Sequence, residues 1–108
     1  MRGIKATKPW ELKAYQDVLG EEGLRFLEEL LVYAHGQLIS GKIDSRSPYL
    51  YIFFHDSYLR KYNDLSEDQR KVFFCLHRAK YRAEGWQDAN LLTQDATGKP
   101  KLSLSLSL

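Results

Sequence analysis

Apolar residues recur at intervals of three and four through residues 9–84, which is the spacing of one helix face. Pro9 suits a first helical turn and Gly20 suits a helix end, so we expect one helix over residues 9–19 and a second over 21–40. The second helix carries the longest apolar stripe, which consists of Leu24, Leu27, Leu31, Ala34 and Leu38.

The segment 48–62 contains signals for both a strand and a helix. Tyr49 to Phe54 is a run of aromatic and aliphatic residues rich in strand formers. Ser47 and Pro48 together match a helix N-cap followed by proline in the first turn. Helical spacing also continues well past the run, at Tyr51, Phe54, Tyr58 and Tyr62. We therefore predict a third helix over residues 48–62.

A fourth helix is predicted over residues 67–84. Ser66 followed three residues later by Gln69 matches a capping box, and Gly85 provides a stop. One apolar stripe along this helix consists of Val72, Cys75, Leu76, Ala79 and Ala83.

The end of the chain changes from a period of about 3.6 to a period of two. Leucine and serine alternate strictly from Leu102 to Leu108, which is a strand pattern, and residues 95–98 have turn chemistry. We expect a β-hairpin at 89–108, although so simple an alternation also fits a frayed low-complexity tail. The predicted fold is mainly α, a single domain over residues 1–108, with four helices followed by a small C-terminal β-hairpin in a winged-helix-like order.

Length and composition narrow the class of protein. A chain of 108 residues with 44% hydrophobic and 28% charged residues suits one folded domain and does not have a disordered composition. No apolar run reaches the roughly 20 residues that span a bilayer, and the N-terminus lacks a signal-peptide pattern. Cys75 is the single cysteine, so a disulfide framework is excluded and a cytoplasmic location is expected, with no membrane partner.

The net charge of +2 conceals a division along the chain. Residues 21–40 carry four acids and one base, a net charge of −3, whereas residues 58–82 carry seven bases and three acids, a net charge of +4. A separation of this kind says more about binding partners than the total charge does.

The basic stretch coincides with an element order typical of DNA-binding proteins: a helix, a short turn, a basic helix and a hairpin. On a helix, Lys71, Arg78 and Arg82 fall within about 40° of one another, where they can contact phosphates. Gln69 or Arg70 near the helix start can reach base edges. Lys99 and Lys101 at the hairpin complete the candidate contacts. The leading hypothesis is a small helix-turn-helix regulator that places residues 67–84 on double-stranded DNA.

The same basic residues also fit an ordinary solvated helix face. Glu67 precedes Lys71 by four residues, a spacing that stabilises an isolated helix. A pI near 8.7 is modest for a nucleic-acid binder.

The alternative hypothesis is a protein-interaction module, such as an adaptor, an inhibitor or an assembly factor. Phe74 and Tyr81 lie away from the stripe assigned to the core and can anchor a partner or a second copy in a homodimer. Leu102, Leu104 and Leu106 can present an edge strand to a partner, or they can close this domain's own core.

Catalytic and metal-binding patterns are absent from the sequence. Cys75 and His77 are two residues apart, so on a helix they diverge by roughly 200° and do not meet as nucleophile and base. The chain has one cysteine and three histidines, with no pair at zinc-ligand spacing, and its glycines match no phosphate-binding loop. We expect a protein without enzymatic activity, metal or cofactor.

Overall fold

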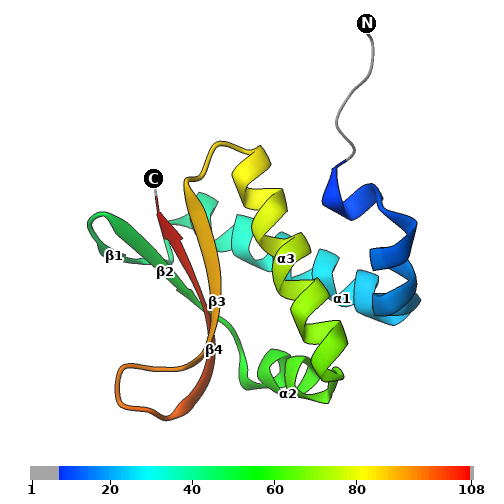
Figure 1. The fold of residues 1–108 in the computed structure, drawn as a ribbon. Helices are drawn as coiled ribbons and strands as arrows, with labels where there is room; N and C mark the ends of the chain where they lie inside the picture. The colour runs from blue at the N-terminus through cyan, green and yellow to red at the C-terminus, as the bar shows by residue number, and fades with distance from the viewer. Residues whose placement is uncertain (1–7, 108) are drawn as a thin grey trace, which may run out of the picture.

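The computed structural model describes residues 8–107, and its helices lie on one face of a four-stranded antiparallel sheet (Figure 1). A short 3-10 turn, η1 (Pro9–Glu11), precedes the first helix. The helices are α1 (Lys13–Ser40), α2 (Asp56–Asp64) and α3 (Glu67–Ala83). The strands are β1 (Asp44–Arg46), β2 (Tyr49–Phe53), β3 (Asp88–Gln94) and β4 (Pro100–Ser107), and their order in the sheet is β1-β2-β4-β3.

The predicted fold class is wrong: the protein is mixed α/β, with three α-helices and a four-stranded sheet in the described residues in place of four helices and a hairpin. The predicted helices 9–19 and 21–40 form η1 and one long helix, α1. That helix kinks at Gly20, where φ is 71° and ψ is 175°. The segment predicted as helix 48–62 divides into β2 and α2.

Strand β2 forms because its two flanks are both paired. Antiparallel pairing places Leu50 opposite Leu106 and Ile52 opposite Leu104 on β4, while β1 covers the other edge. The residues that favour a strand locally are therefore paired along the whole of β2 by β4 and over Tyr49–Tyr51 by β1, and Ile52 is buried. The helical spacing of the later tyrosines belongs to α2, which begins only at Asp56.

Strand β4 is the centre of the sheet. It lies between β2 and β3, and its leucines are buried while Ser105 and Ser107 are half-buried on the other face. Leu102, Leu104 and Leu106 are each 0% exposed, which makes the strict Leu-Ser alternation a core strand of this domain. Leu108 lies outside the described residues.

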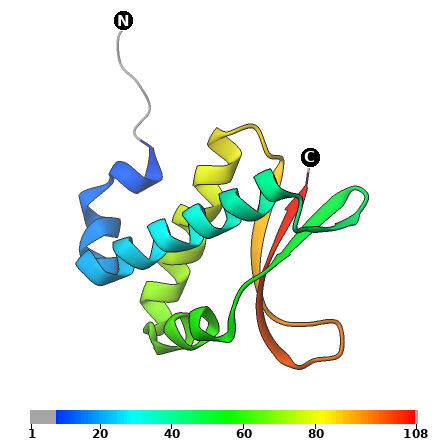
Figure 2. The same ribbon diagram turned by 180° about the vertical axis from the view of Figure 1, so that it is seen from behind.

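Helix α3 packs on the sheet at β3 and α2 packs on it at β4, while α1 packs against α3 (Figure 2). Its boundaries agree with the predicted helix 67–84, but its buried side differs from the predicted stripe. Phe73, Leu76, His77 and Tyr81 are the buried residues, whereas Cys75 and Ala83 are exposed. The helix is therefore rotated by roughly 100° from the orientation predicted from Val72, Cys75 and Ala79.

Candidate nucleic-acid interface

The start of α3 is held in place by Gln69. The Gln69 backbone N–H donates to Ser66 Oγ at 3.1 Å, and the Gln69 side-chain oxygen accepts from the Ser66 backbone N–H at 2.9 Å, which completes the predicted capping box. The Gln69 side-chain amide also donates to the carbonyls of Val18 and Leu19 at 3.3 and 3.4 Å. Gln69, predicted to reach base edges, therefore caps α3 and ties it to α1.

Arg70 closes the turn between α2 and α3. Its Nη1 donates to the carbonyl of Leu65 at 2.7 Å and to that of Asn63 at 3.3 Å. The nearby Tyr62 hydroxyl has a raised pKa because burial disfavours its charged form, an effect that the Arg70 charge partly offsets. Arg70 is thus engaged with backbone carbonyls and is not directed at solvent.

The exposed side of α3 carries the other predicted phosphate contacts, Lys71, Arg78 and Arg82. The Lys71 side chain is 70% exposed, and its Nζ lies 3.6 Å from Glu67 Oε1. The Arg78 side chain is 40% exposed, and its Nε lies 2.7 Å from Asp88 Oδ1 on β3. Arg82 is exposed on the last turn of the helix. These three cations line one side of the helix, as the sequence spacing predicts.

Asp88 fixes Arg78 against the sheet. Hydrogen bonds hold the pKa of the Asp88 carboxyl below its usual range, first from the Asn90 side chain and then from the Ala89 backbone N–H, with Arg78 contributing further. The carboxylate is therefore ionised at neutral pH and positions the guanidinium at one border of the exposed face. Sequence spacing gave no sign of this pair, because Asp88 belongs to a different element.

The loop between β3 and β4 places Lys99 at the end of the hairpin. Asp95 Oδ1 accepts from the backbone N–H and hydroxyl of Thr97 and from the backbone N–H of Lys99, at 2.6–3.0 Å, and Gly98 has a φ of 83°. These bonds lower the pKa of Asp95, led by that from the Thr97 side chain. Lys99 is exposed in this ordered loop, whereas Lys101 Nζ lies 3.7 Å from Asp56 Oδ1 on α2.

The hairpin loop and the first turns of α3 lie towards the same end of the molecule, with α2 between them (Figures 1 and 2). A shallow groove of about 940 Å³ runs between α3 and β3. Lys71, Phe74 and Cys75 line it from the helix, and Leu91 and Thr93 line it from the strand. Among the predicted contacts that remain, Lys71 lines this groove, whereas Arg78, Arg82 and Lys99 lie outside it.

The residues predicted to bind a protein partner are mostly in the core. Tyr81 is 7% exposed, and its hydroxyl is buried without a hydrogen-bond partner among the described residues. Leu102, Leu104 and Leu106 are fully buried. Strand β4 has no free edge, because β2 pairs with one of its edges and β3 with the other. Phe74 is half-buried in the groove beside β3. An interaction through the C-terminal strand edge is therefore incompatible with this sheet order.

Cysteine and histidine lie apart in the structure as well. Cys75 is exposed on α3, while His77 is 1% exposed and packs between Phe73 and Tyr81. Burial lowers the pKa of His77 to about 3. Within residues 8–107, no three histidine, cysteine, aspartate or glutamate side chains gather as a metal site would require.

Comparisons with protein-family models, curated proteins and solved structures found no match to this chain. In the part of the chain that the structure covers, no helix is both long enough and apolar enough to cross a bilayer. A functional assignment therefore depends on the charges and geometry of the surface itself.

Proposed function

We propose that the protein binds double-stranded DNA through the exposed side of α3, with Lys71, Arg78 and Arg82 contacting backbone phosphates. The observation that carries the proposal is the presentation of these three cations on one exposed helix side, directly after a short turn from α2 and before a β-hairpin. A helix preceded by a short turn is a common means of entering the major groove.

Contacts within the protein reduce the number of residues that are free to contact DNA. Gln69 and Arg70 are engaged with Ser66, α1 and the α2–α3 turn, so they position the helix and take no part in the proposed contacts. Lys71 and Arg82 become the principal contacts, because the Lys71 pair with Glu67 is exposed and long and such pairs exchange readily. Arg78 contributes a further phosphate contact from the border of the exposed face, where Asp88 holds its guanidinium group.

The hairpin supplies a second point of contact through Lys99, which is exposed in the ordered loop at the same end of the molecule. Lys101 can join this contact only by leaving Asp56 for a phosphate. The Asp56 side chain is 73% exposed, so water can solvate its carboxylate when Lys101 leaves. Contacts from a helix and a loop would fix the orientation of the protein on the duplex.

The proposal also limits the kind of recognition. The exposed face of α3 carries the cations Lys71, Arg78 and Arg82 beyond its acidic first turn, which holds Glu67 and Asp68. Cation-to-phosphate contacts of the kind that these three residues favour depend little on sequence. We therefore propose binding that is dominated by the DNA backbone, in a cytoplasmic protein. The predicted homodimer stays a prediction.

The test measures the affinity for a fluorescein-labelled 20-base-pair duplex by fluorescence anisotropy, at NaCl concentrations from 50 to 200 mM. About four phosphate contacts predict that the affinity falls roughly a hundredfold over this range. The double variant K71Q/R82Q should lower the slope of log Kd against log salt by about two and weaken binding at 50 mM NaCl.

The matched control is K13Q/K42Q, which removes two exposed cations near the two ends of α1, neither of which belongs to the proposed contact set on α3. It loses the same net charge and should retain most of the affinity. Equal weakening by the two double variants would mean that only total charge matters, and no binding by the unmodified protein at 50 mM NaCl would refute the proposal.

A further inference from the structure

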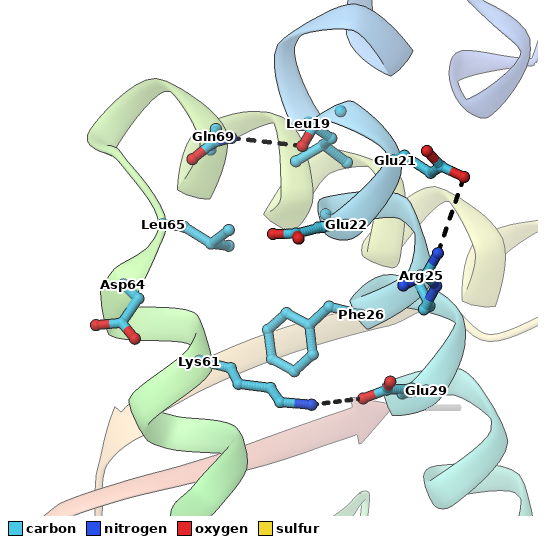
Figure 3. A pocket seen from close by; sticks show the side chains of 12 residues that line it. Leu19, Glu21, Glu22, Arg25, Phe26, Glu29, Lys61, Asp64, Leu65 and Gln69 are labelled. Atoms are coloured by element: carbon cyan, nitrogen blue, oxygen red, sulfur yellow. Dashed lines mark hydrogen bonds and ion pairs between the residues drawn. The ribbon is translucent and has the colours of Figure 1, made fainter.

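A second concave surface lies at the kink of α1, in the part of the chain whose net charge is negative. The groove has a volume of about 610 Å³ and runs between the part of α1 that follows Gly20 and the end of α2 (Figure 3). Its apolar lining is provided by Leu19, Phe26 and Leu65. This surface takes no part in the proposed DNA contacts.

The walls of the groove are held by contacts between separate helices. Gln69 binds the carbonyls that precede Gly20, which fixes the α1 kink against the start of α3. At the other end, Lys61 Nζ of α2 lies 3.0 Å from Glu29 Oε2 of α1 and 5.8 Å from the centre of the Phe26 ring. The groove is therefore a preformed feature of the folded chain, which lowers the entropic cost of binding.

The charged groups at its rim are predominantly acidic. Four carboxylates, those of Glu21, Glu22, Glu29 and Asp64, face two cations, Arg25 and Lys61. Arg25 lies 3.8 Å from Glu21, and Lys61 lies 3.0 Å from Glu29. Among residues 8–107, Glu22 and Asp64 make no ion pair. Glu22 reaches into the groove from α1, whereas Asp64 lies at its rim on α2 with its carboxylate turned outward (Figure 3).

Lys61 shows which chemistry this surface accepts. Its ammonium group lies between a carboxylate and an aromatic ring, while its stem runs along the groove wall. Cations above an aromatic ring and beside a carboxylate gain from both interactions, and the aliphatic stems of lysine and arginine gain from apolar contact. The end of the groove bordered by Glu22, Asp64 and Leu65 offers a similar combination of apolar surface and negative charge.

We propose that this groove docks an extended segment of a protein partner by taking up an arginine side chain at the rim that carries Glu22 and Asp64, with a neighbouring apolar side chain on the partly exposed Leu65. Charge complementarity selects this occupant, because two unpaired carboxylates repel nucleic acid and attract a guanidinium group. The docking surface is thus separate from the exposed face of α3, and the two proposals do not depend on each other.

The test uses the capped peptide acetyl-Gly-Leu-Arg-Leu-amide as the probe, added to uniformly ¹⁵N-labelled protein at 50 mM NaCl. Amide chemical shifts should change at residues 19–29 and 61–69 and saturate with a Kd in the millimolar range. The same peptide with citrulline, a neutral analogue of arginine, should bind at least threefold more weakly, since it keeps the shape and removes the charge.

The variant E22Q/D64N should weaken peptide binding by about tenfold, because each exposed carboxylate contributes a modest ionic contact. Both positions are exposed, and removing an acid from the last turn of α2 does not oppose the helix dipole, so the variant should stay folded. The control E28Q removes a neighbouring acid of α1 that does not line the groove, and it should leave the Kd unchanged.

The proposal would be overturned by an absence of shifts at 10 mM peptide, by shifts elsewhere on the protein, or by equal binding of the citrulline peptide. Unchanged affinity in E22Q/D64N would overturn it as well. Shifts of the same amides on raising the protein concentration alone, with a doubled mass in light scattering, would assign the groove to a second copy of the chain and also refute the peptide proposal.

Discussion

His77 makes the stability of the fold sensitive to acid. Its side chain is 1% exposed and stacks on Phe73, with ring centres 6.3 Å apart, while the Tyr81 ring lies 4.9 Å away. Its Nε2 is buried with no hydrogen-bond partner among the described residues. Burial lowers the pKa of His77 to about 3, because no neighbouring group compensates the cost of charging the ring.

The sign and size of the effect follow from proton linkage. In the unfolded chain the pKa of histidine is about 6.5, so below that pH the unfolded state binds a proton that the folded state excludes. The free energy of unfolding should therefore fall as the pH drops below about 6.5. The loss due to His77 is about 2 kcal/mol between pH 8 and pH 5, and it grows to about 4 kcal/mol at pH 3.

The perturbation is His77→Phe, which keeps an aromatic ring between Phe73 and Tyr81 and removes the titrating group. Urea unfolding, followed by the fluorescence of Trp10 and Trp86, gives the free energy of unfolding for both proteins from pH 8 to pH 5. The difference between the proteins at each pH isolates the contribution of His77, because the other titrating groups are common to both.

The wild type should lose about 2 kcal/mol relative to His77→Phe as the pH falls from 8 to 5, whatever the larger ring does to stability at pH 8. A difference that stays constant across this range would refute the burial argument. A His77 pKa near 6.5, measured by NMR in the folded wild type, would refute it independently.

Three further stability predictions can be checked by urea unfolding at pH 7. Gly20→Ala should destabilise the protein by about 1 kcal/mol, because φ is 71° at the kink. Gly36→Ala lies in the regular part of α1 with open space around it and should stabilise the protein by up to about 1 kcal/mol. Equal effects of the two substitutions would contradict the kink. Leu104→Ala should lower the free energy of unfolding by about 2–5 kcal/mol, because the side chain is 0% exposed. Ser105→Ala, on the other face of β4, should lower it by under about 1 kcal/mol. A small loss of stability in Leu104→Ala would contradict the central position of β4. Gln69→Ala should cost about 1–2 kcal/mol by removing the capping box and the bonds to α1, and no measurable loss would show that these bonds do not hold the helices together.

The elements with strong local signals were predicted well. The capping box at Ser66 and the stop at Gly85 fixed the limits of α3 closely, and the Leu-Ser alternation identified β4. Each signal depends on residues within a few positions of one another, and no distant partner is needed to produce it.

The segment Tyr49–Phe53 shows why the fold class was wrong. Its local preference for a strand was set against a helical spacing that in fact belongs to α2. The strand is stabilised by β4, more than 50 positions later in the sequence, through pairs such as Ile52 with Leu104. Tertiary pairing of this kind decides between competing local preferences, and spacing alone does not reveal it.

The orientation of α3 was missed for a related reason. Its core side includes His77 and Tyr81. Tyr81 was assigned to an interface because it lies opposite a stripe that includes Cys75 and Ala83, and these two small residues are in fact exposed. Small residues on a helix surface cost little, and aromatic rings supply most of the buried area.

The candidate site was predicted in part. The common face of Lys71, Arg78 and Arg82 follows from helix geometry, and all three side chains are at least partly exposed. The roles of Gln69 and Arg70 could not be predicted, since their partners are carbonyl groups placed by the fold.

The most direct test of the proposed function is an amide chemical-shift map of ¹⁵N-labelled protein titrated with an unlabelled 16-base-pair duplex at 50 mM NaCl. DNA binding through α3 and the hairpin predicts shifts at Lys71, Cys75, Arg78 and Arg82 and at residues 97–99, reversed by 300 mM NaCl. Shifts confined to α1 or to β1 and β2, or an unchanged spectrum, would contradict the account.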